Sequence, residues 1–298
     1  MKAIIPVAGH GTRLEPHSNH TQKCLLPVAG KPILAHILDR IIDVGVDEVV
    51  LIIGDHGDHV RVFCDMYSAD MNFIFVNQKE QLGLGHAIGL GLEKINEPVL
   101  IILGDSIFEL DYSKFISSGI NSIGVFEVPD PERFGIVEVN ESNIVEFVEK
   151  PENPKSNLAI GGIYWIQCQQ ELVNSLNYLY KNKIQTNNEY QLTDGLQYML
   201  SKGAKFSAKK IDSCLDCGIP DTLLATNKKL LINNNSIHES SVVSNSKLSG
   251  ATVMENCTIM NAELENVIML PGASIKNCKF KDRIIGYNEI LEDMKVLA

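Results

Sequence analysis

The amino-acid sequence predicts an α/β domain built on a mixed, mainly parallel sheet, followed by a short left-handed β-helix. Strand and helix patterns alternate over roughly the first 100 residues, which favours a parallel sheet with helices on both faces. A strand-rich middle follows, and beyond Ile232 apolar residues recur at intervals of five or six. This last pattern is typical of stacked β-coils.

The first half of the chain carries the alternation. Residues 3–7 form a short apolar run bounded by glycine, which is typical of a buried parallel strand. From Lys31 to Val44 the apolar residues fall on one helical face, with Pro32 suited to a first turn and Gly45 to a helix end. Further strands are expected at 48–53, 73–76 and 99–103, with a helix at 85–95.

The middle of the chain is dominated by strand-like segments separated by turn residues. We interpret it as a mixed-sheet excursion of the same domain, which spans residues 1–232. The expected strands are 123–128, 135–139, 144–148, 159–166 and 205–211, and the expected helices are 169–181, 190–202 and 220–232.

A separate repeat region begins after the asparagine linker at 233–235. The spacing predicts a hexapeptide β-helix over 236–286, in which each flat side turns one apolar residue inward and about three coils fit. An irregular β-rich tail is the alternative. Residues 287–298 form the C-terminal tail, for which a short closing helix is possible. The expected inward residues are Ile237, Val243, Leu248, Val253, Ile259, Leu264, Leu270, Ile275, Phe280 and Ile285.

The composition restricts the class of protein. The chain has 298 residues, of which 45% are hydrophobic and 21% charged, values ordinary for a globular protein. A net charge of −11 provides no basic surface for nucleic acid. No apolar run approaches the length of a membrane helix, and we expect no signal peptide. Seven cysteines, an odd number, suggest reduced thiols in the cytoplasm.

The strongest local signal is Ala-Gly-His-Gly-Thr-Arg-Leu at residues 8–14, directly after the first strand. Glycines let backbone amides approach phosphate oxygens, and the Arg13 guanidinium is suited to phosphate. A dinucleotide fingerprint fails at Leu14, and a Walker loop fails because Pro32 follows Gly30-Lys31. Taken alone, the segment is also compatible with a plain strand–helix loop.

Residues 23–32 read Lys-Cys-Leu-Leu-Pro-Val-Ala-Gly-Lys-Pro. Together with residues 8–14, they closely resemble the signature of sugar-1-phosphate nucleotidylyltransferases, nearest to glucose-1-phosphate thymidylyltransferases and UTP–glucose-1-phosphate uridylyltransferases. The resemblance implies a Rossmann-like nucleotidyltransferase domain over 1–232, and the β-helix also occurs in long members of the family. The resemblance to the family continues at Gln78 together with residues 83–87, and at residues 103–105, 134–137, 149–151 and 215–218.

The resemblance implies an enzyme that joins a sugar 1-phosphate to a nucleoside triphosphate, releases pyrophosphate and uses Mg²⁺. Asp105 and Asp216 would hold the metal, since Mg²⁺ takes oxygen ligands. The implied catalytic residues are Arg13, Lys23, Asp105, Lys150 and Asp216. The implied nucleotide-binding residues are Ala8, Gly9, Gly11, Thr12, Arg13, Lys23, Gln78, Gly83 and Asp105. The implied sugar-phosphate residues are Gly135, Glu149, Lys150 and Gly162.

The sequence restricts the choice of nucleotide and sugar phosphate only in part. Gln78 can offer a donor and an acceptor to a pyrimidine edge, which favours dTTP or UTP. The resemblance implies glucose 1-phosphate as the sugar. Cys24 and Ser106 depart from the family pattern and leave both choices open. A phosphomonoester is already a nucleophile at neutral pH, so the reaction needs positioning and charge neutralisation and no general base.

Other functions remain alternatives. A guanylyl- or cytidylyltransferase would keep the reaction class, whereas a catalytically silent sugar-nucleotide sensor would not need the two aspartates. An acyltransferase would need a catalytic histidine loop in the repeat, where His238 is the lone candidate. The flat sides of a short β-helix favour a homo-oligomer, and no membrane or nucleic-acid partner is expected.

Several smaller motifs have plainer interpretations. Cys214-x-x-Cys217 invites zinc but lacks a second ligand pair, so buried thiols are favoured. The loop Asp55–His59 could hold a metal or begin a helix. His10 could touch phosphate but is not expected to be catalytic, and His36 is expected on a solvated helix face.

Overall fold

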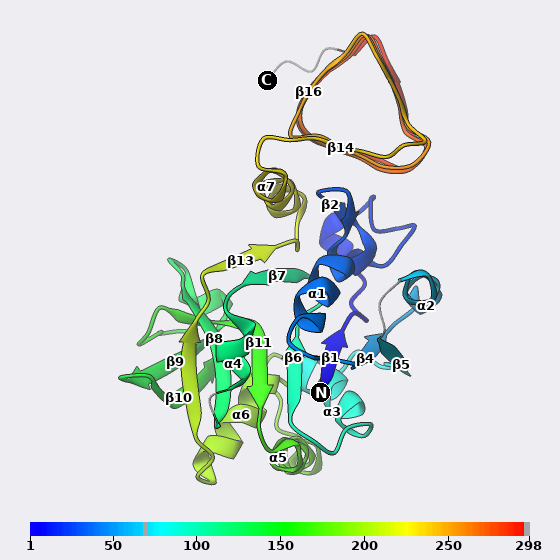
Figure 1. Ribbon diagram of the computed structural model, residues 1–298. Coiled ribbons are helices and arrows are strands. Elements are labelled where there is room, and N and C mark those ends of the chain that lie inside the picture. Colours follow the sequence, from blue (N-terminus) through cyan, green and yellow to red (C-terminus); the bar gives the residue numbers. More distant parts are fainter. Residues whose placement is uncertain (68–70, 118, 295–298) are drawn as a thin grey trace. The chain divides into compact units, whose positions relative to one another are not determined.

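The structure is a computed structural model that describes residues 1–67, 71–117 and 119–294 (Figure 1). The chain divides into two compact units. Unit 1 comprises residues 1–9, 37–104 and 108–214, and unit 2 comprises residues 10–36, 105–107 and the chain from 215 onward. Among the described residues, none of the helices is long and apolar enough to cross a membrane.

Unit 1 is built on a mixed nine-stranded sheet in the order β5-β4-β1-β6-β11-β8-β12-β10-β9. The first four strands in that order are parallel, and β8 and β12 form a further parallel pair. β11 joins the two parts by antiparallel pairing with β6 and β8. The bounds are β1 Lys2–Pro6, β4 Glu48–Ile53, β5 Asn72–Asn77, β6 Val99–Ile102, β8 Asn121–Glu127, β9 Gly135–Asn140, β10 Asn143–Glu149, β11 Leu158–Ile166 and β12 Phe206–Lys210.

Helices pack on this sheet because each turns an apolar stripe toward it. α3 packs against β1 and β4, and α6 packs against β10, while α3, α5 and α6 contact one another. Their buried residues join those of the sheet in one core that includes Ile4, Ile88 and Leu196. The helices are α1 Ile33–Ile42, α2 Gly57–Met66, α3 Leu84–Leu92, α4 Tyr112–Ile116, α5 Gln169–Asn182 and α6 Leu192–Ser201, with a 3-10 turn, η3, at Pro131–Arg133. The short strands β7 Ser106–Glu109 and β13 Ser213–Asp216 pair in a separate two-stranded sheet.

Unit 2 contains the N-terminal segment 10–36, helix α7 and the C-terminal repeat. The N-terminal segment includes 3-10 turns at Thr12–Leu14 (η1) and Lys23–Leu25 (η2), and a hairpin of β2 Pro27–Val28 with β3 Lys31–Pro32. α7 spans Pro220–Leu231, with proline in its first turn. Asn227 of α7 is fully buried and accepts hydrogen bonds from Ala29 N and Thr252 Oγ1.

The repeat is a coil of short parallel strands with a triangular outline in Figure 1. Each strand pairs with the one 16 residues later, as in Val242 with Thr258 and Thr258 with Ser274. Apolar side chains therefore stack inside in columns, such as Val243, Ile259, Ile275 and Leu291. The strands are β14 Ser236–Ile237, β15 Val242–Ser244, β16 Lys247–Ser249, β17 Thr252–Val253, β18 Thr258–Met260, β19 Glu263–Met269, β20 Ser274–Lys276, β21 Lys279–Ile285 and β22 Ile290–Glu292.

The corners of the coil are built from residues that tolerate a left-handed backbone. Positive φ angles recur at spacings of five, five and six residues, at positions occupied by Asn, Asp or Gly. The corner side chains also bond along the stack: Asn261 Nδ2 donates to Asn277 Oδ1 at 3.1 Å, and Asn277 Nδ2 donates to Asp293 Oδ1 at 2.8 Å. The positive-φ corners from 245 onward are Asn245, Gly250, Asn256, Asn261, Asn266, Gly272, Asn277, Asp282, Asn288 and Asp293.

Three sequence-based predictions need correction. The helix expected from Lys31 begins at Ile33, because Lys31 and Pro32 pair with Val28 and Pro27. Ile237, expected inside, is 46% exposed at the open first coil. Residues 290–292 form a strand where a closing helix was expected, and 295–298 lie outside the described residues.

Candidate functional site

The glycine loop is anchored in unit 2 by Leu14, which is fully buried at the end of η1. Anchoring Leu14 leaves Thr12 and Arg13 exposed at the start of the turn. Gly11 has a φ of 67°, and a Cβ there would lie 3.1 Å from the Cβ of Lys23. Only glycine fits this left-handed, crowded position without strain. Ser18 Oγ donates a 2.9 Å hydrogen bond to the Gly11 carbonyl, which fixes the loop from the other side.

Lys23 and Asp105 form the main ion pair of this part of unit 2. The Lys23 ammonium lies 2.7 Å from Asp105 Oδ2, and the Lys23 side chain is only 12% exposed. Ser106 Oγ donates to the second carboxylate oxygen of Asp105 at 3.3 Å. The sequence separation is 82 residues, so the fold brings the signature lysine to the aspartate that follows β6.

Asp216 is joined to this pair through Cys217. The Cys217 amide donates to the Asp105 carbonyl at 3.0 Å, and Asp216 Oδ1 accepts from Gly218 N at 2.9 Å. Burial raises the pKa of the Cys217 thiol to about 12, with smaller contributions from the charges of Asp216 and Asp105. The backbone next to Asp216 is therefore hydrogen-bonded to Asp105.

The predicted base-binding residues lie in unit 1, where β5 ends and α3 begins. Gln78 follows β5, and its Nε2 lies 3.4 Å from the Gly83 carbonyl and 3.2 Å from His86 Nδ1. Gly83 caps α3 with a φ of 107°, and a Cβ there would lie 2.7 Å from the Tyr190 carbonyl. The Ala8 carbonyl accepts a 3.0 Å hydrogen bond from Gln81 Nε2, so the loop that holds Gln78 also contacts the end of the first strand segment.

Three of the predicted sugar-site residues, Gly135, Glu149 and Lys150, come together where β9 begins and β10 ends. Thr193 Oγ1 donates to Glu149 Oε2 at 2.7 Å, and Lys150 Nζ lies 3.6 Å from Glu149 Oε1. A Cβ at Gly135 would lie 2.9 Å from Glu149 Oε2, so the glycine keeps this side of the carboxylate open. Glu149 is 9% exposed and Lys150 is 44% exposed, which leaves the ammonium accessible to an anion.

Gly162 has a packing role in the described structure. Its carbonyl accepts from Leu103 N at 2.9 Å, and the Leu103 side chain fills the space that a Cβ would need. It lies in β11, where the pairing with β8 shifts register between Ile160 and Tyr164. The geometry thus accounts for this glycine through backbone packing.

Some contacts were not predicted from the sequence. Ser18, Gln81, His86 and Thr193 each bond to a predicted site residue or its backbone. His86 lies inside the resembling segment 83–87 and could have been singled out there, and Gln81 lies between Gln78 and that segment. Thr193 is 44 residues from Glu149, and nothing in its local sequence indicates the contact.

Two of the smaller motifs are also clarified. His36 is buried and its Nε2 lies 2.8 Å from the Val28 carbonyl, so the expectation of a solvated His36 is wrong. This contact links α1 to β2 of the hairpin. Asp55–His59 leads into α2, and the rings of His56 and His59 stack with centroids 5.8 Å apart. All seven cysteines are free thiols.

In the candidate site, the side chains that could hold a metal ion are those of Asp105 and Asp216. Within the described ranges, three or more His, Cys, Asp or Glu side chains are nowhere gathered in a way that could hold a metal ion. Asp105 and Asp216 provide only carboxylate oxygens, the donors that a hard cation takes. Such a pair fits an ion that keeps several water ligands and also takes ligands from substrate phosphates, as Mg²⁺ does.

Comparison with known proteins gives consistent relatives. The chain is 34% identical over 260 residues to the bifunctional protein GlmU of Methanocaldococcus jannaschii, covering 87% of this chain and 61% of that protein. It is 32% identical over 245 residues to UTP–glucose-1-phosphate uridylyltransferase 1 of Staphylococcus saprophyticus, covering 69% of this chain and 84% of that protein. The chain thus spans less than two thirds of the length of the GlmU relative.

Solved structures agree with these relatives. A UDP-glucose pyrophosphorylase complexed with UDP-glucose superposes with a TM-score of 0.68 at 25% identity, covering 78% of this chain and 98% of that chain. A protein from Bacillus anthracis assigned as a glucose-1-phosphate thymidylyltransferase, in complex with a sucrose, gives 0.65 at 26% identity, covering 76% and 94%.

The family model described as nucleotidyl transferase matches residues 2–233. This range contains all the predicted site residues and excludes the coiled repeat. The resemblance drawn from the motifs is therefore confirmed at the level of the family. The chain belongs to the nucleotidyl transferase family.

Proposed function

We propose that this protein is a sugar-1-phosphate nucleotidylyltransferase that transfers a nucleotidyl group from UTP or dTTP to glucose 1-phosphate and releases pyrophosphate. The observation that carries the proposal is the Lys23–Asp105 pair with Asp216 joined to it through Cys217. A lysine ammonium paired with one aspartate, and a second aspartate beside a residue bonded to the first, suit a polyphosphate with its metal. The relatives named for uridylyl and thymidylyl transfer to glucose 1-phosphate support the substrate choice.

In this proposal, the glycine loop, Lys23 and the two aspartates hold the triphosphate and the metal. Gly11 and Thr12 offer backbone amides, and Arg13 offers a fork of donors that neutralises charge developing at the α-phosphorus. Asp105 and Asp216 would hold Mg²⁺, which supplies charge neutralisation to the phosphates. Lys23 pairs with the Asp105 carboxylate and would also contact phosphate oxygens.

Other predicted site residues would hold the base and the sugar. Gln78 and Gly83 would contact the base, with Ala8 and Gly9 at the start of the phosphate loop. Glu149, held by Thr193, is an acceptor suited to sugar hydroxyls, while Lys150 and the backbone of Gly135 and Gly162 complete the sugar-phosphate set. A sugar-phosphate dianion attacks without a general base, so these residues act by orientation.

The organisation of the chain is part of the proposal. We assign residues 1–232 to a catalytic domain, 236–286 to a left-handed β-helix and 287–298 to a C-terminal tail. The stacked strands leave flat outer sides that suit assembly into a homo-oligomer. Free thiols on every cysteine suit a cytoplasmic enzyme, and the acidic charge gives no reason to expect a nucleic-acid or membrane partner.

The test is pyrophosphate release in the presence of Mg²⁺, with each of UTP, dTTP, CTP, GTP and ATP against glucose, galactose, mannose and N-acetylglucosamine 1-phosphates. We expect release only when both substrates are present, strongest with UTP or dTTP and glucose 1-phosphate. Release that survives chelation of divalent ions and the Asp105→Asn substitution would refute the metal assignment. No release with any pair, from folded protein that still binds a nucleoside triphosphate, would favour the silent sensor.

A further inference from the structure

We propose that His86 is a positioning residue that fixes the amide orientation of Gln78 and thereby selects uracil or thymine over cytosine. The inference rests on the proposed function, in which Gln78 contacts the base. The question is whether the NH₂ group or the oxygen of the Gln78 amide faces the base. Two contacts of this amide within unit 1 determine the answer.

The first contact identifies the amide nitrogen. One end of the Gln78 side chain lies 3.4 Å from the Gly83 carbonyl oxygen. A carbonyl oxygen accepts hydrogen bonds and does not donate them, so the NH₂ group must be at this end. The length of this hydrogen bond makes it a weak restraint by itself.

The second contact is shorter and uses the other proton. Gln78 Nε2 lies 3.2 Å from His86 Nδ1. In the neutral ring with its proton on Nε2, Nδ1 is an acceptor and takes the second amide proton. Both protons of the amide are then bound to protein, and the Gln78 oxygen is the group left for a ligand.

The His86 ring is held in place on helix α3. Tyr180 packs edge-on against it, with ring centroids 6.4 Å apart and an interplanar angle of 75°. The Tyr180 hydroxyl donates to the Gly85 carbonyl at 2.9 Å, which ties α5 to the first turn of α3. The acceptor that faces Gln78 therefore belongs to a half-buried ring that packs on Tyr180.

Uracil and thymine differ from cytosine at N3, the ring nitrogen that a single acceptor such as the Gln78 oxygen can distinguish. Uracil and thymine carry a proton on N3, which can donate to the Gln78 oxygen. Cytosine has an unprotonated N3, whose lone pair would face that oxygen and repel it. An amide free to rotate could turn its NH₂ group toward cytosine, whereas an amide held by His86 and Gly83 cannot do so without losing both hydrogen bonds.

The test compares two substitutions of nearly matched shape. His86→Asn keeps an acceptor close to the position of Nδ1, and His86→Leu removes it. The readout is the ratio of kcat/KM for UTP to that for CTP, with glucose 1-phosphate as the second substrate. We expect His86→Leu to lower this ratio about fivefold, the factor associated with one ordinary hydrogen bond. His86→Asn should keep the ratio within about twofold of the unsubstituted enzyme, since the acceptor remains.

A purely structural role for His86 predicts a different pattern. Both substitutions would then lower turnover with UTP and CTP alike, and an unchanged ratio in His86→Leu would overturn the proposal. Tyr180→Phe is the matched control, because it disturbs the same helix pair and leaves Nδ1 in place. Its ratio should stay constant even where its activity falls.

Failure of the proposed function would be visible separately. If the unsubstituted protein releases no pyrophosphate with any substrate pair, UTP and CTP binding is measured by calorimetry on the same variants. A loss of UTP-over-CTP preference in His86→Leu alone would then still support the positioning role. An unsubstituted enzyme that turns over both nucleotides equally would overturn the inference and leave the proposed function standing.

Discussion

Asn227 makes the most consequential buried hydrogen bonds in unit 2, and its replacement should be strongly destabilising. Its side chain is fully buried on α7. Oδ1 accepts from Ala29 N at 2.9 Å and from Thr252 Oγ1 at 2.6 Å, and Nδ2 donates to the Gly250 carbonyl at 3.1 Å. One side chain thus joins the signature segment 23–32, helix α7 and the coiled repeat.

The cost of Asn227→Leu follows from the groups that it leaves unpaired. Leucine has similar size, so the main loss is the three hydrogen bonds. A buried polar group without a partner costs about 1–3 kcal/mol. Thr252 and Gly250 are buried, whereas Ala29 is half-buried and can reach water. We therefore expect Asn227→Leu to lower the free energy of unfolding by about 3–5 kcal/mol. In this estimate the unpaired Ala29 amide is given a cost near the lower end of the range, because it can reach water.

The assay is urea unfolding followed by circular dichroism and tryptophan fluorescence. Lys228→Ala is the matched control, because Lys228 is the exposed neighbour on the same helix and should change stability by less than about 0.5 kcal/mol. Adding Thr252→Val to Asn227→Leu removes one unpaired hydroxyl, so the double substitution should cost less than the sum of the two single ones. A loss below about 1 kcal/mol for Asn227→Leu, or strict additivity in the double substitution, would refute the reasoning.

Three further predictions address the site and the fold. Lys23→Ala should lower kcat about 100-fold or more, as removal of a charged transition-state contact does, while far-ultraviolet circular dichroism stays unchanged; an activity within threefold of the original would count against a role for Lys23. Gly11→Ala should raise the KM for the nucleotide, because the φ of 67° at this position is strained for alanine and a Cβ would crowd Lys23. Steady-state kinetics at saturating sugar phosphate would measure this KM, and an unchanged value would contradict the prediction. Burial, helped by the charge of Asp65, raises the pKa of the Cys64 thiol from 9.0 to about 12, so its contribution to stability is full below pH 9 and lost as the pH rises toward 12. Cys64→Ala should flatten this alkaline loss in thermal unfolding scans, and equal slopes in both proteins would reject the assignment.

The fold of unit 1 was largely predictable because its signals are local. Apolar runs such as 48–53 and 99–103 are strands, at Glu48–Ile53 and Val99–Ile102. The position of α1 was less predictable, since Pro32 favours a first helical turn as readily as the strand pairing it makes with Pro27. That choice depends on residues outside the local window.

In the repeat, apolar spacing and corner chemistry carry different information. The apolar residues correctly indicate sides of five or six residues, but they do not fix the coil length. The coil length of 16 is set by the corners, where Asn, Asp and Gly adopt positive φ and Asn261 bonds to Asn277. Reading the asparagine and glycine positions together with the apolar ones would have given the period.

The site residues were predictable where a motif names them and unpredictable where tertiary contacts do. Arg13, Lys23 and Asp105 stand in recognisable segments, and the structure brings Lys23 to Asp105. Thr193 and Asn227 lie outside those segments and act through hydrogen bonds to distant residues. No local sequence pattern marks such residues, because their hydrogen-bond partners are distant in sequence and come close only in the folded chain.

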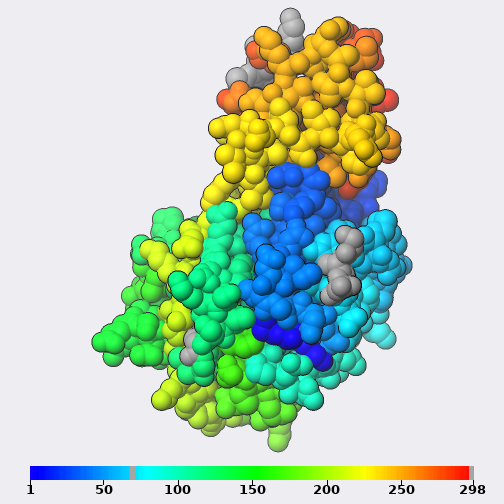
Figure 2. All heavy atoms as spheres, in the orientation of Figure 1, coloured from blue at the N-terminus to red at the C-terminus, as the bar shows by residue number. Residues whose placement is uncertain are grey.

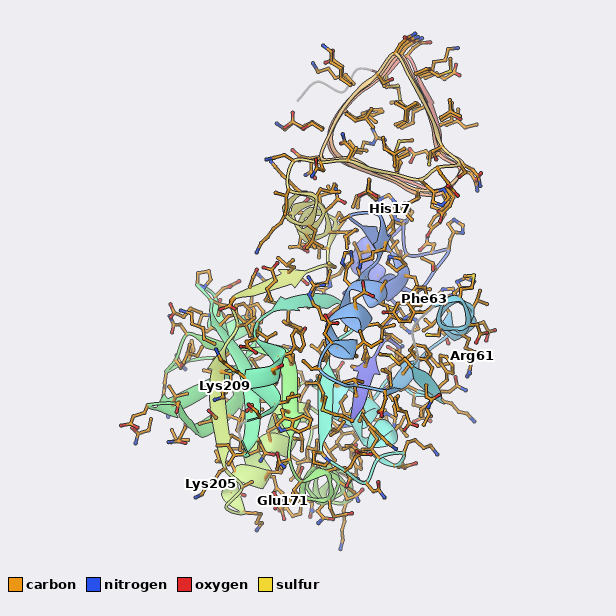
Figure 3. All side chains as sticks on the ribbon, viewed as in Figure 1. His17, Arg61, Phe63, Glu171, Lys205 and Lys209 are labelled. Carbon is orange, nitrogen blue, oxygen red and sulfur yellow. The ribbon has the colours of Figure 1, made fainter. Side chains whose placement is uncertain are left out.

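The contacts of the repeat within unit 2 bear on what this region does for the enzyme. His17, which follows the glycine loop, packs near Gly286, as Figure 3 shows it beside the coil, and the His20 ring lies 5.6 Å from that of Tyr287. In Figure 2 the N-terminal segment lies directly against the repeat.

Those contacts fall at the far end of the loop that begins with Gly11 and is fixed by Ser18. Asn227 holds the other end of the same segment at Ala29. The repeat therefore contacts one part of the segment 10–36 directly and supports another part through Asn227 of α7. These contacts lie within one chain, so they restrain the segment whether or not subunits assemble. If the segment binds a nucleotide as proposed, the repeat contributes to that binding independently of assembly.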